Sequence, residues 1–260
     1  MKQREAVVAG QFYPESTQHL RAEIGSFLTP PIEPEIQVHA LIVPHAGYCY
    51  SGAVAGEAYA YLKSIAIDIK RVVLLGPSHR VALRGCAISD YDLFTSPLGQ
   101  IEVDNKGYDE LLTLEEVNLS DQAHLWEHSL EVQLPFLQYC LNDFKIVPIV
   151  VGYCQPCTIS NILSVLKVDD PSTLVVVSSD LSHYHPYQEA QTLDNKTIDK
   201  ILNYDNSLAG EDACGCFAVN GLLDYAKVQK WKIKLTKKAN SGDVLGGKQE
   251  VVGYASFILY

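Results

Sequence analysis

The sequence predicts an α/β protein with three layers, α/β/α, in which helices cover both faces of a central mixed, mostly parallel sheet. Three short apolar runs carry this prediction, at Leu41–Val43, Val72–Leu75 and Leu174–Val177. Continuous apolar runs of this length are typical of strands that are buried on both faces. Segments with helical periodicity separate the runs, and strands that alternate with helices favour a parallel sheet.

The expected elements follow one another along the whole chain. Ser16 is placed to cap a first helix, which the prolines at positions 30, 31 and 34 end with a short linker. Strands are expected at 38–43, 71–75, 145–151 and 173–177, helices at 52–65, 104–114 and 158–166, and short strands or a hairpin within 84–103. Towards the C-terminus, helices are expected at 187–203 and 218–228, and strands at 231–236 and 250–260 around a glycine-rich loop at 240–247.

Composition narrows the class of protein. The 260 residues have an ordinary hydrophobic content of 47%, and they show no internal repeat, so one domain is expected. A formal net charge of −11 argues against a nucleic-acid binder, which needs clustered lysine and arginine. No run approaches the roughly 20 apolar residues of a membrane span, and the N-terminus lacks the apolar core of a signal peptide. We therefore expect a cytoplasmic protein without membrane contact.

The seven cysteines are odd in number and scattered, which indicates buried thiols rather than a disulfide framework. Cys154 and Cys157 form a Cys-x-x-Cys pair that superficially resembles a redox dithiol, and Cys214 and Cys216 form a second close pair. A dithiol or zinc site built from these pairs stays a minor alternative, because the flanking patterns of such sites are missing.

A histidine follows each of the three apolar runs within a few residues: His45, His79 and His183. The carboxyl ends of parallel strands meet at one edge of a sheet, where open α/β sheets bind their ligands. Neutral imidazoles combined with a carboxylate suit Fe(II), zinc or copper, and a histidine that is not a ligand can move protons near neutral pH. The sequence therefore predicts a histidine site at this edge.

Further candidates lie beside these histidines. His128 belongs to the polar stretch from His124 to Glu131, and Asp180 precedes His183 by three residues. Glu127 or Asp180 would orient a ring nitrogen of a ligand histidine. A single histidine after a strand is more commonly a capping residue, and the histidines at positions 19, 39, 124 and 185 keep that structural interpretation, with 124 and 185 expected in loops.

Two other site types have no matching pattern. Gly76-Pro-Ser-His79 lacks the glycine and lysine spacing of a phosphate loop. There is no Gly-x-Ser-x-Gly turn of a serine hydrolase. Ser78, Ser178 and Ser179 are therefore expected only as polar contacts.

Four motifs occur in order along the chain: Pro44-His-Ala-Gly-Tyr48, Gly76-Pro-Ser-His79, Glu127-His-Ser-x-Glu131 and Ser178-Ser-Asp-x-x-His183. Together they closely resemble the Memo-like family, which is named for a mediator of cell motility in animals and is widespread in archaea and bacteria. The resemblance runs over nearly the whole chain and implies a single Memo-like domain, 1–260. The family is similar in fold to the class III extradiol ring-cleaving dioxygenases, which hold non-haem iron.

The resemblance implies a metal site. His45 and His79 match the two metal-binding histidines of the family, and the implied metal is iron, with copper, zinc or no metal as alternatives. In animal members a cysteine near the C-terminus completes the site. The position aligned with that cysteine is Val244, which cannot bind a metal, and the adjacent Asp243 could substitute only if the glycine-rich loop were shifted.

The resemblance also implies the residues around the metal. His183 matches the catalytic histidine of the dioxygenases, and Asp180 lies beside it. The remaining assigned positions are His128 in catalysis and Glu127, Ser78 and Cys214 in contact with the substrate.

Three functions are compatible with this pocket. The first is a metal-dependent oxidoreductase with dioxygenase-like chemistry, in which His183 acts as acid and base. The second is a binding protein that holds a peptide or small ligand without turnover, which Val244 favours. The third is a zinc hydrolase. Prokaryotic members of the family are associated with radical-SAM proteins, which implies a partner of that kind.

Overall fold

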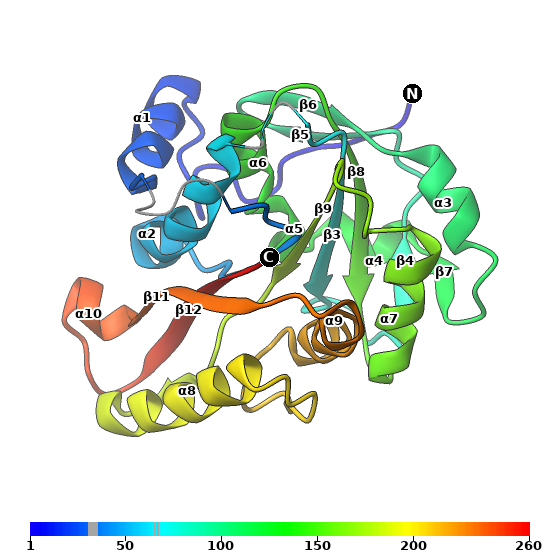
Figure 1. Cartoon of the computed structure of the whole chain (residues 1–260). Coiled ribbons are helices and arrows are strands. Elements are labelled where there is room, and N and C mark those ends of the chain that lie inside the picture. Colours follow the sequence, from blue (N-terminus) through cyan, green and yellow to red (C-terminus); the bar gives the residue numbers. More distant parts are fainter. Residues whose placement is uncertain (31–35, 65, 67) are drawn as a thin grey trace.

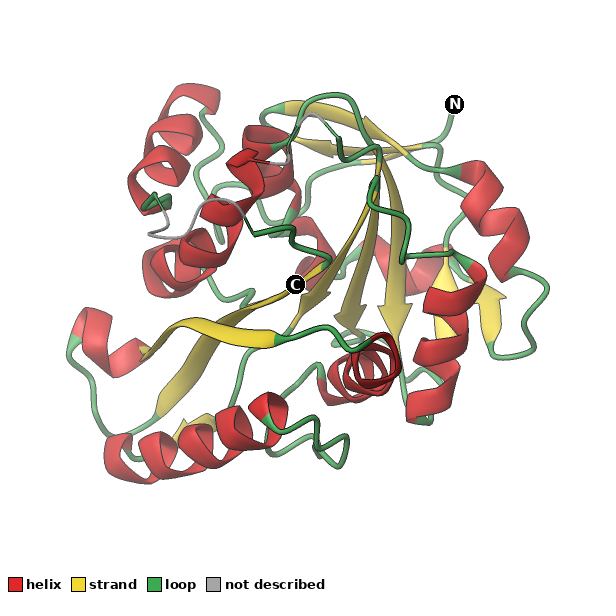
Figure 2. Cartoon of the chain, in the orientation of Figure 1, coloured by secondary structure: helices red, strands yellow, loops and turns green. Residues whose placement is uncertain are grey.

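The computed structural model describes residues 1–30, 36–64, 66 and 68–260, and it confirms an α/β protein with a mixed sheet flanked by helices (Figures 1 and 2). The central sheet has the order β10 (His183–His185), β12 (Val251–Leu259), β2 (Ala40–Val43), β9 (Thr173–Ser178), β3 (Arg71–Pro77), β8 (Lys145–Val151), β4 (Cys86–Ile88) and β7 (Val117–Leu119), with β11 (Ile233–Asn240) paired to β12. The neighbours β2, β9, β3 and β8 are parallel, whereas β12 and β4 run antiparallel beside them.

Helices lie on both faces of this sheet. Figure 1 shows α1 (Thr17–Phe27), α2 (Tyr48–Tyr59) and α6 (Leu134–Cys140) on one side of the parallel strands, and α7 (Pro156–Val165) and α9 (Cys216–Gln229) on the other. The other helical segments are η1 (Ala60–Ser64), α3 (Asn105–Leu111), α4 (Asp121–Leu125), α5 (His128–Glu131), α8 (Tyr187–Leu202) and α10 (Ser241–Leu245). Because both faces are covered, the parallel strands are buried almost throughout, which explains their continuous apolar sequences.

A smaller sheet joins the N-terminus to the rest of the domain. β1 (Gln3–Arg4) runs parallel to β5 (Leu93–Ser96), and β5 forms a hairpin with β6 (Gly99–Glu102). The expectation of short strands or a hairpin within 84–103 is thereby confirmed. Within the described ranges, no helix has both the length and the apolar character that crossing a membrane requires.

Four parts of the chain differ from the sequence-based expectation. The segment 240–247 was expected as a loop, but it contains α10, because the Asn240 side chain accepts hydrogen bonds from the backbone N–H groups of Gly242 and Asp243. His124 and His185 were expected in loops, but His124 is buried in α4 and His185 lies in β10. The expected helix at 52–65 begins earlier, at Tyr48.

Part of the sequence-based expectation falls on residues that the structure does not describe. Ile65, the expected end of that helix, and prolines 31 and 34 of the expected linker lie outside the described residues.

Candidate metal centre

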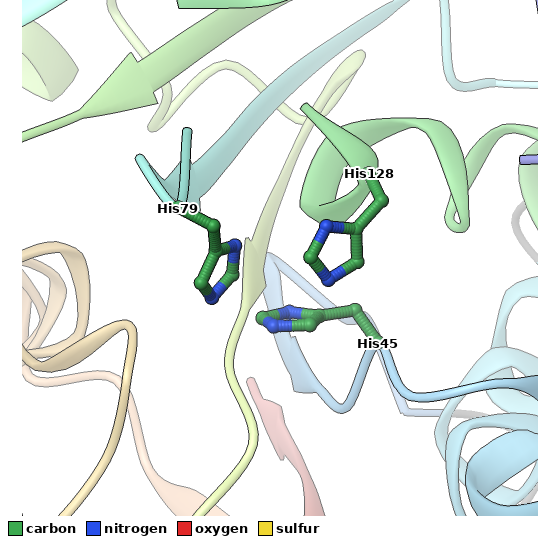
Figure 3. Close-up of side chains that lie close together, drawn as sticks. All are labelled: His45, His79 and His128. Atoms are coloured by element: carbon green, nitrogen blue, oxygen red, sulfur yellow. The ribbon is translucent and has the colours of Figure 1, made fainter. Parts of the chain in front are cut away.

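Three histidines converge at the carboxyl edge of the parallel strands. His45 follows β2, His79 follows β3, and His128 is the first residue of α5. One ring nitrogen from each lies within 4.8 Å of the others, and Figure 3 shows the rings turned toward one another. Gly76 of β3 permits this approach, because a β-carbon there would lie 2.6 Å from Ser129 Oγ of α5.

Hydrogen bonds select the tautomer of His45. Its Nδ1 lies 2.8 Å from Ser178 Oγ, and Ser178 donates its single hydroxyl proton to Ser129 O at 2.7 Å. Gln133 Nε2 also donates to Ser178 Oγ, at 2.9 Å. Ser178 can therefore only accept from His45, so the proton of the neutral ring is on Nδ1. The lone pair on Nε2 is left for a metal ion.

His79 has the same tautomer for a different reason. Its Nδ1 lies 2.9 Å from Glu127 Oε1, and its backbone N–H donates to Glu127 Oε2 at 2.6 Å. Burial alone would raise the pKa of Glu127, but the hydrogen bonds and the electrostatic attraction of His79, together with the Ser129 N–H, outweigh it and lower the pKa to about 2. Glu127 is therefore a carboxylate that accepts from Nδ1–H, and Nε2 of His79 carries the lone pair.

His128 is held less firmly than the other two histidines. Its Nδ1 is buried and has no hydrogen-bond partner, and it lies 3.5 Å from Glu127 Oε1. The ring packs against Phe12, with 4.7 Å between the ring centroids, and against His79, with 4.6 Å between centroids. Packing therefore sets the position of the ring, while its tautomer is free to follow a bound ion.

Burial keeps the imidazoles of His45 and His128 uncharged. Burial, and then the neighbouring His79, lowers the pKa of His45 to about 3. Burial and the rings of His45 and His79 lower the pKa of His128 to about 4. Both rings are thus neutral at neutral pH, and a neutral imidazole is the form that binds a metal.

Asp180, Cys214 and His183 surround the three rings. Asp180 Oδ1 accepts the backbone N–H of His45 at 2.8 Å, and burial raises the pKa of Asp180. Cys214 Sγ lies 3.4 Å from His45 Nε2. Gly215 permits this contact, because a β-carbon there would lie 2.7 Å from Ser178 O. His183 begins β10 and lines the cavity beside the rings.

A cavity of about 500 Å³ opens beside the histidines. This volume holds a small organic molecule. Its walls come from segments that are far apart in the sequence: Phe12, His45, Ala46, Gly47, Tyr50, His79, Arg80, His128, Asp180, His183, Tyr184, Ser241, Val252 and Tyr254.

Comparisons with known proteins identify the family of this chain. The family model described as Memo-like protein matches residues 4–258. The chain belongs to the Memo-like family. It is 38% identical to a MEMO1 family protein of Sulfurisphaera tokodaii, over 97% of this chain and 98% of that protein. It is 36% identical to one of Methanosarcina mazei, over 100% of both chains.

A solved structure supports the fold of this Memo-like protein. The uncharacterized protein JW3007 from Escherichia coli K12 superposes with a TM-score of 0.50, covering 85% of this chain and 99% of that chain. The two sequences are 14% identical, so the likeness concerns the fold alone.

Val244 and Cys214 differ in their distance from the histidines of this Memo-like protein. Val244 is on α10, is 45% exposed and does not line the histidine cavity. The cysteine beside the histidines is Cys214, in the turn before α9. Val244 therefore contributes no donor to the histidines, whereas Cys214, which the sequence motifs placed in the pocket, brings a thiol close to His45.

Two residues expected at the substrate have other contacts. Ser78 Oγ donates to Val81 O at 2.6 Å within a turn and does not line the cavity. Glu127 is 1% exposed, and its two oxygens accept hydrogen bonds from His79 and Ser129. It therefore orients His79 rather than meeting a substrate.

Sequence reasoning missed the residues that orient His45. Ser178 was expected as no more than a polar contact, and Gln133 was not singled out, yet both fix the Nδ1–H tautomer. Gln133 also donates to Pro44 O at 2.9 Å, which holds the loop that carries His45. The available signal was their position in the chain, since Ser178 opens the fourth motif and Gln133 follows the third by two residues.

Proposed function

We propose that this Memo-like protein binds one first-row transition metal through His45, His79 and His128, and that it is an oxidoreductase acting on a small organic substrate in the adjoining cavity. The convergence of three ring nitrogens within 4.8 Å carries this proposal. Because Nδ1 of His45 and of His79 is engaged in a hydrogen bond, the lone pair of each neutral ring is on Nε2. These two nitrogens therefore need no rearrangement to bind an ion.

The donor set favours iron(II) first, with zinc and copper as alternatives. Imidazole suits all three metals, and a neighbouring carboxylate such as Asp180 favours iron. The Cys214 thiol beside His45 would favour zinc or Cu(I) once it loses its proton. Burial, and then Asp180, raises the pKa of Cys214, so the thiol keeps that proton in the absence of an ion.

The residues of this chain have different roles at such a metal site. A bound metal would polarise a substrate oxygen and, if it is iron or copper, exchange electrons with the substrate. His183 lines the same cavity without belonging to the ligand group, which suits a residue that gives and takes a proton. Asp180 holds the backbone of His45 in place through its hydrogen bond to the N–H.

The other proposals use the same pocket. A hydrolase would differ in holding zinc and in attacking an ester or amide with water. A binding protein without turnover stays an alternative, because Val244 supplies no ligand, although Cys214 places a thiol 3.4 Å from His45 Nε2. A peptide as ligand and a radical-SAM protein as partner stay predictions.

Elemental analysis of protein purified without oxygen tests the proposal. We expect about one iron, zinc or copper per chain in the wild type, and none in His45→Ala. His19→Ala, which removes an exposed histidine of α1, is the matched control and should keep the metal. An unchanged metal content in His45→Ala would refute the proposal. Ester hydrolysis by the zinc-loaded protein, absent with iron, would favour the hydrolase.

A further inference from the structure

Arg80 is the single arginine or lysine among the residues that line the histidine cavity. It follows His79 directly, at the carboxyl end of β3, so it stands at the cavity wall beside a proposed ligand. The chain as a whole carries a formal net charge of −11, with 20 basic against 31 acidic residues. A lone cation at this place is therefore not part of a general basic surface.

The guanidinium of Arg80 is available to a ligand. Within the described part of the chain, it forms no hydrogen bond and no ion pair. The two carboxylates nearest the histidines already have partners, since Asp180 accepts from the His45 backbone and Glu127 accepts from His79 and Ser129. By contrast, Arg71, outside this cavity, is bound to Asp104 at 2.6 Å.

Aromatic side chains form the other walls of the cavity. Phe12, Tyr50 and Tyr254 line it, and Tyr184 lies at its edge with 71% of its surface exposed. Tyr184 has a φ of 62°, a left-handed conformation that is costly for a bulky residue and is commonly retained at binding sites. Its ring stands edge-on to His183, with 5.8 Å between the centroids. Flat apolar groups bind well between such walls.

We propose that the organic ligand of this cavity is an anion, whose carboxylate or phosphate group pairs with Arg80 while its apolar part packs on the aromatic walls. The planar guanidinium binds either group with two parallel hydrogen bonds. This inference rests on the proposed function in placing the reacting part of the ligand at the histidines. The contact with Arg80 itself needs no metal.

Binding of three small probes to the full-length protein, treated with a chelator and followed by calorimetry and ligand-observed NMR, tests the inference. Benzoate and phenyl phosphate carry the two anionic groups, and benzamide is the uncharged counterpart of benzoate. We expect at least one of the anions to bind at least about tenfold more tightly than benzamide, with an affinity that falls as salt rises. The better of the two anions identifies the preferred group.

Variants then test whether Arg80 supplies the positive charge that binds the anion. Arg80→Gln should weaken binding of the preferred anion about tenfold or more, and Arg80→Lys should weaken it less, because the charge remains without the planar fork. Arg84→Gln removes a nearby exposed arginine outside the cavity and should change nothing. Arg80 is exposed, so its variants are expected to fold, which circular dichroism checks.

The inference fails if benzamide binds as tightly as both anions, or if Arg80→Gln binds them as the wild type does. This failure is distinct from failure of the proposed function, because metal content is measured separately. Arg80→Gln with wild-type metal content and lost anion binding would support both.

Discussion

Glu127 and Glu131 stand four residues apart around one short helix, and both are buried, at 1% and 0% exposure. Glu131 forms an ion pair with Arg4 and accepts hydrogen bonds from Tyr13 OH at 2.7 Å and from Val8 N at 2.9 Å. The partners of Glu127 are an imidazole and backbone N–H groups. The same residue type therefore has two environments on one turn.

The difference lies in the charge of the partner. A guanidinium keeps its charge at all ordinary pH values, so it neutralises Glu131 and ties the N-terminal segment to α5. The imidazole of His79 carries no permanent charge, so Glu127 lacks the fixed counter-charge that Arg4 gives to Glu131. An uncompensated carboxylate next to imidazole lone pairs attracts a cation. Glu131 is thus a structural residue, whereas Glu127 orients a histidine of the proposed metal site.

The largest expected effect is a loss of stability when the charge of Glu131 is removed. Glu131→Gln leaves Arg4 buried without a counter-charge, which should cost about 3–5 kcal/mol in the free energy of unfolding. Urea denaturation followed by circular dichroism measures the loss. Glu115→Gln, at an exposed position, is the control and should stay within about 0.5 kcal/mol. A Glu131→Gln protein as stable as this control would contradict the structural role.

Removing the charge of Glu127 is expected to change metal binding. Glu127→Gln should weaken metal affinity about 10–100-fold, because an amide holds the Nδ1–H tautomer of His79 less firmly than a carboxylate does. Competition with a chromophoric zinc chelator measures the affinity. The folded Glu131→Gln protein should keep near-wild-type affinity. Equal losses of metal affinity in the two variants would contradict the separate roles of Glu127 and Glu131.

A smaller, pH-dependent effect is expected on the structural side, at His124. Its Nε2 contacts Ala87 O at 2.9 Å, while Nδ1 is buried without a partner, and burial lowers the pKa to about 4. Protonation of His124 thus disfavours the folded state. The ordinary pKa of this imidazole, 6.5, applies in the unfolded chain, so the free energy of unfolding decreases as the pH falls from 6.5 toward 4.

This effect can be isolated with one variant. Between pH 7.5 and pH 5, the wild type should lose about 2 kcal/mol more than His124→Gln, which keeps a donor for Ala87 O but does not titrate. Urea denaturation at both pH values checks this. Parallel losses in the two proteins would show that His124 does not control the acid sensitivity.

The sequence was sufficient for the fold and for the place of the site. Strands buried on both faces need continuous apolar residues, so 71–75, 145–151 and 173–177 were recognisable, and the structure places strands there. Because parallel strands end at one edge, the histidines that follow β2 and β3 were expected to lie together, and they do. The motifs around them identified the family, and the family model confirmed it.

Only the tertiary structure decided how the site is built. His45 meets Ser178 and Cys214 across 133 and 169 residues of sequence, and these contacts set its tautomer and its neighbouring thiol. Periodicity and local motifs determine which face of an element is buried, but contacts between distant loops depend on sheet order and packing. For the same reason, only the fold shows that Cys214 Sγ lies 3.4 Å from His45 Nε2 and that Glu131 pairs with Arg4 and not with a histidine.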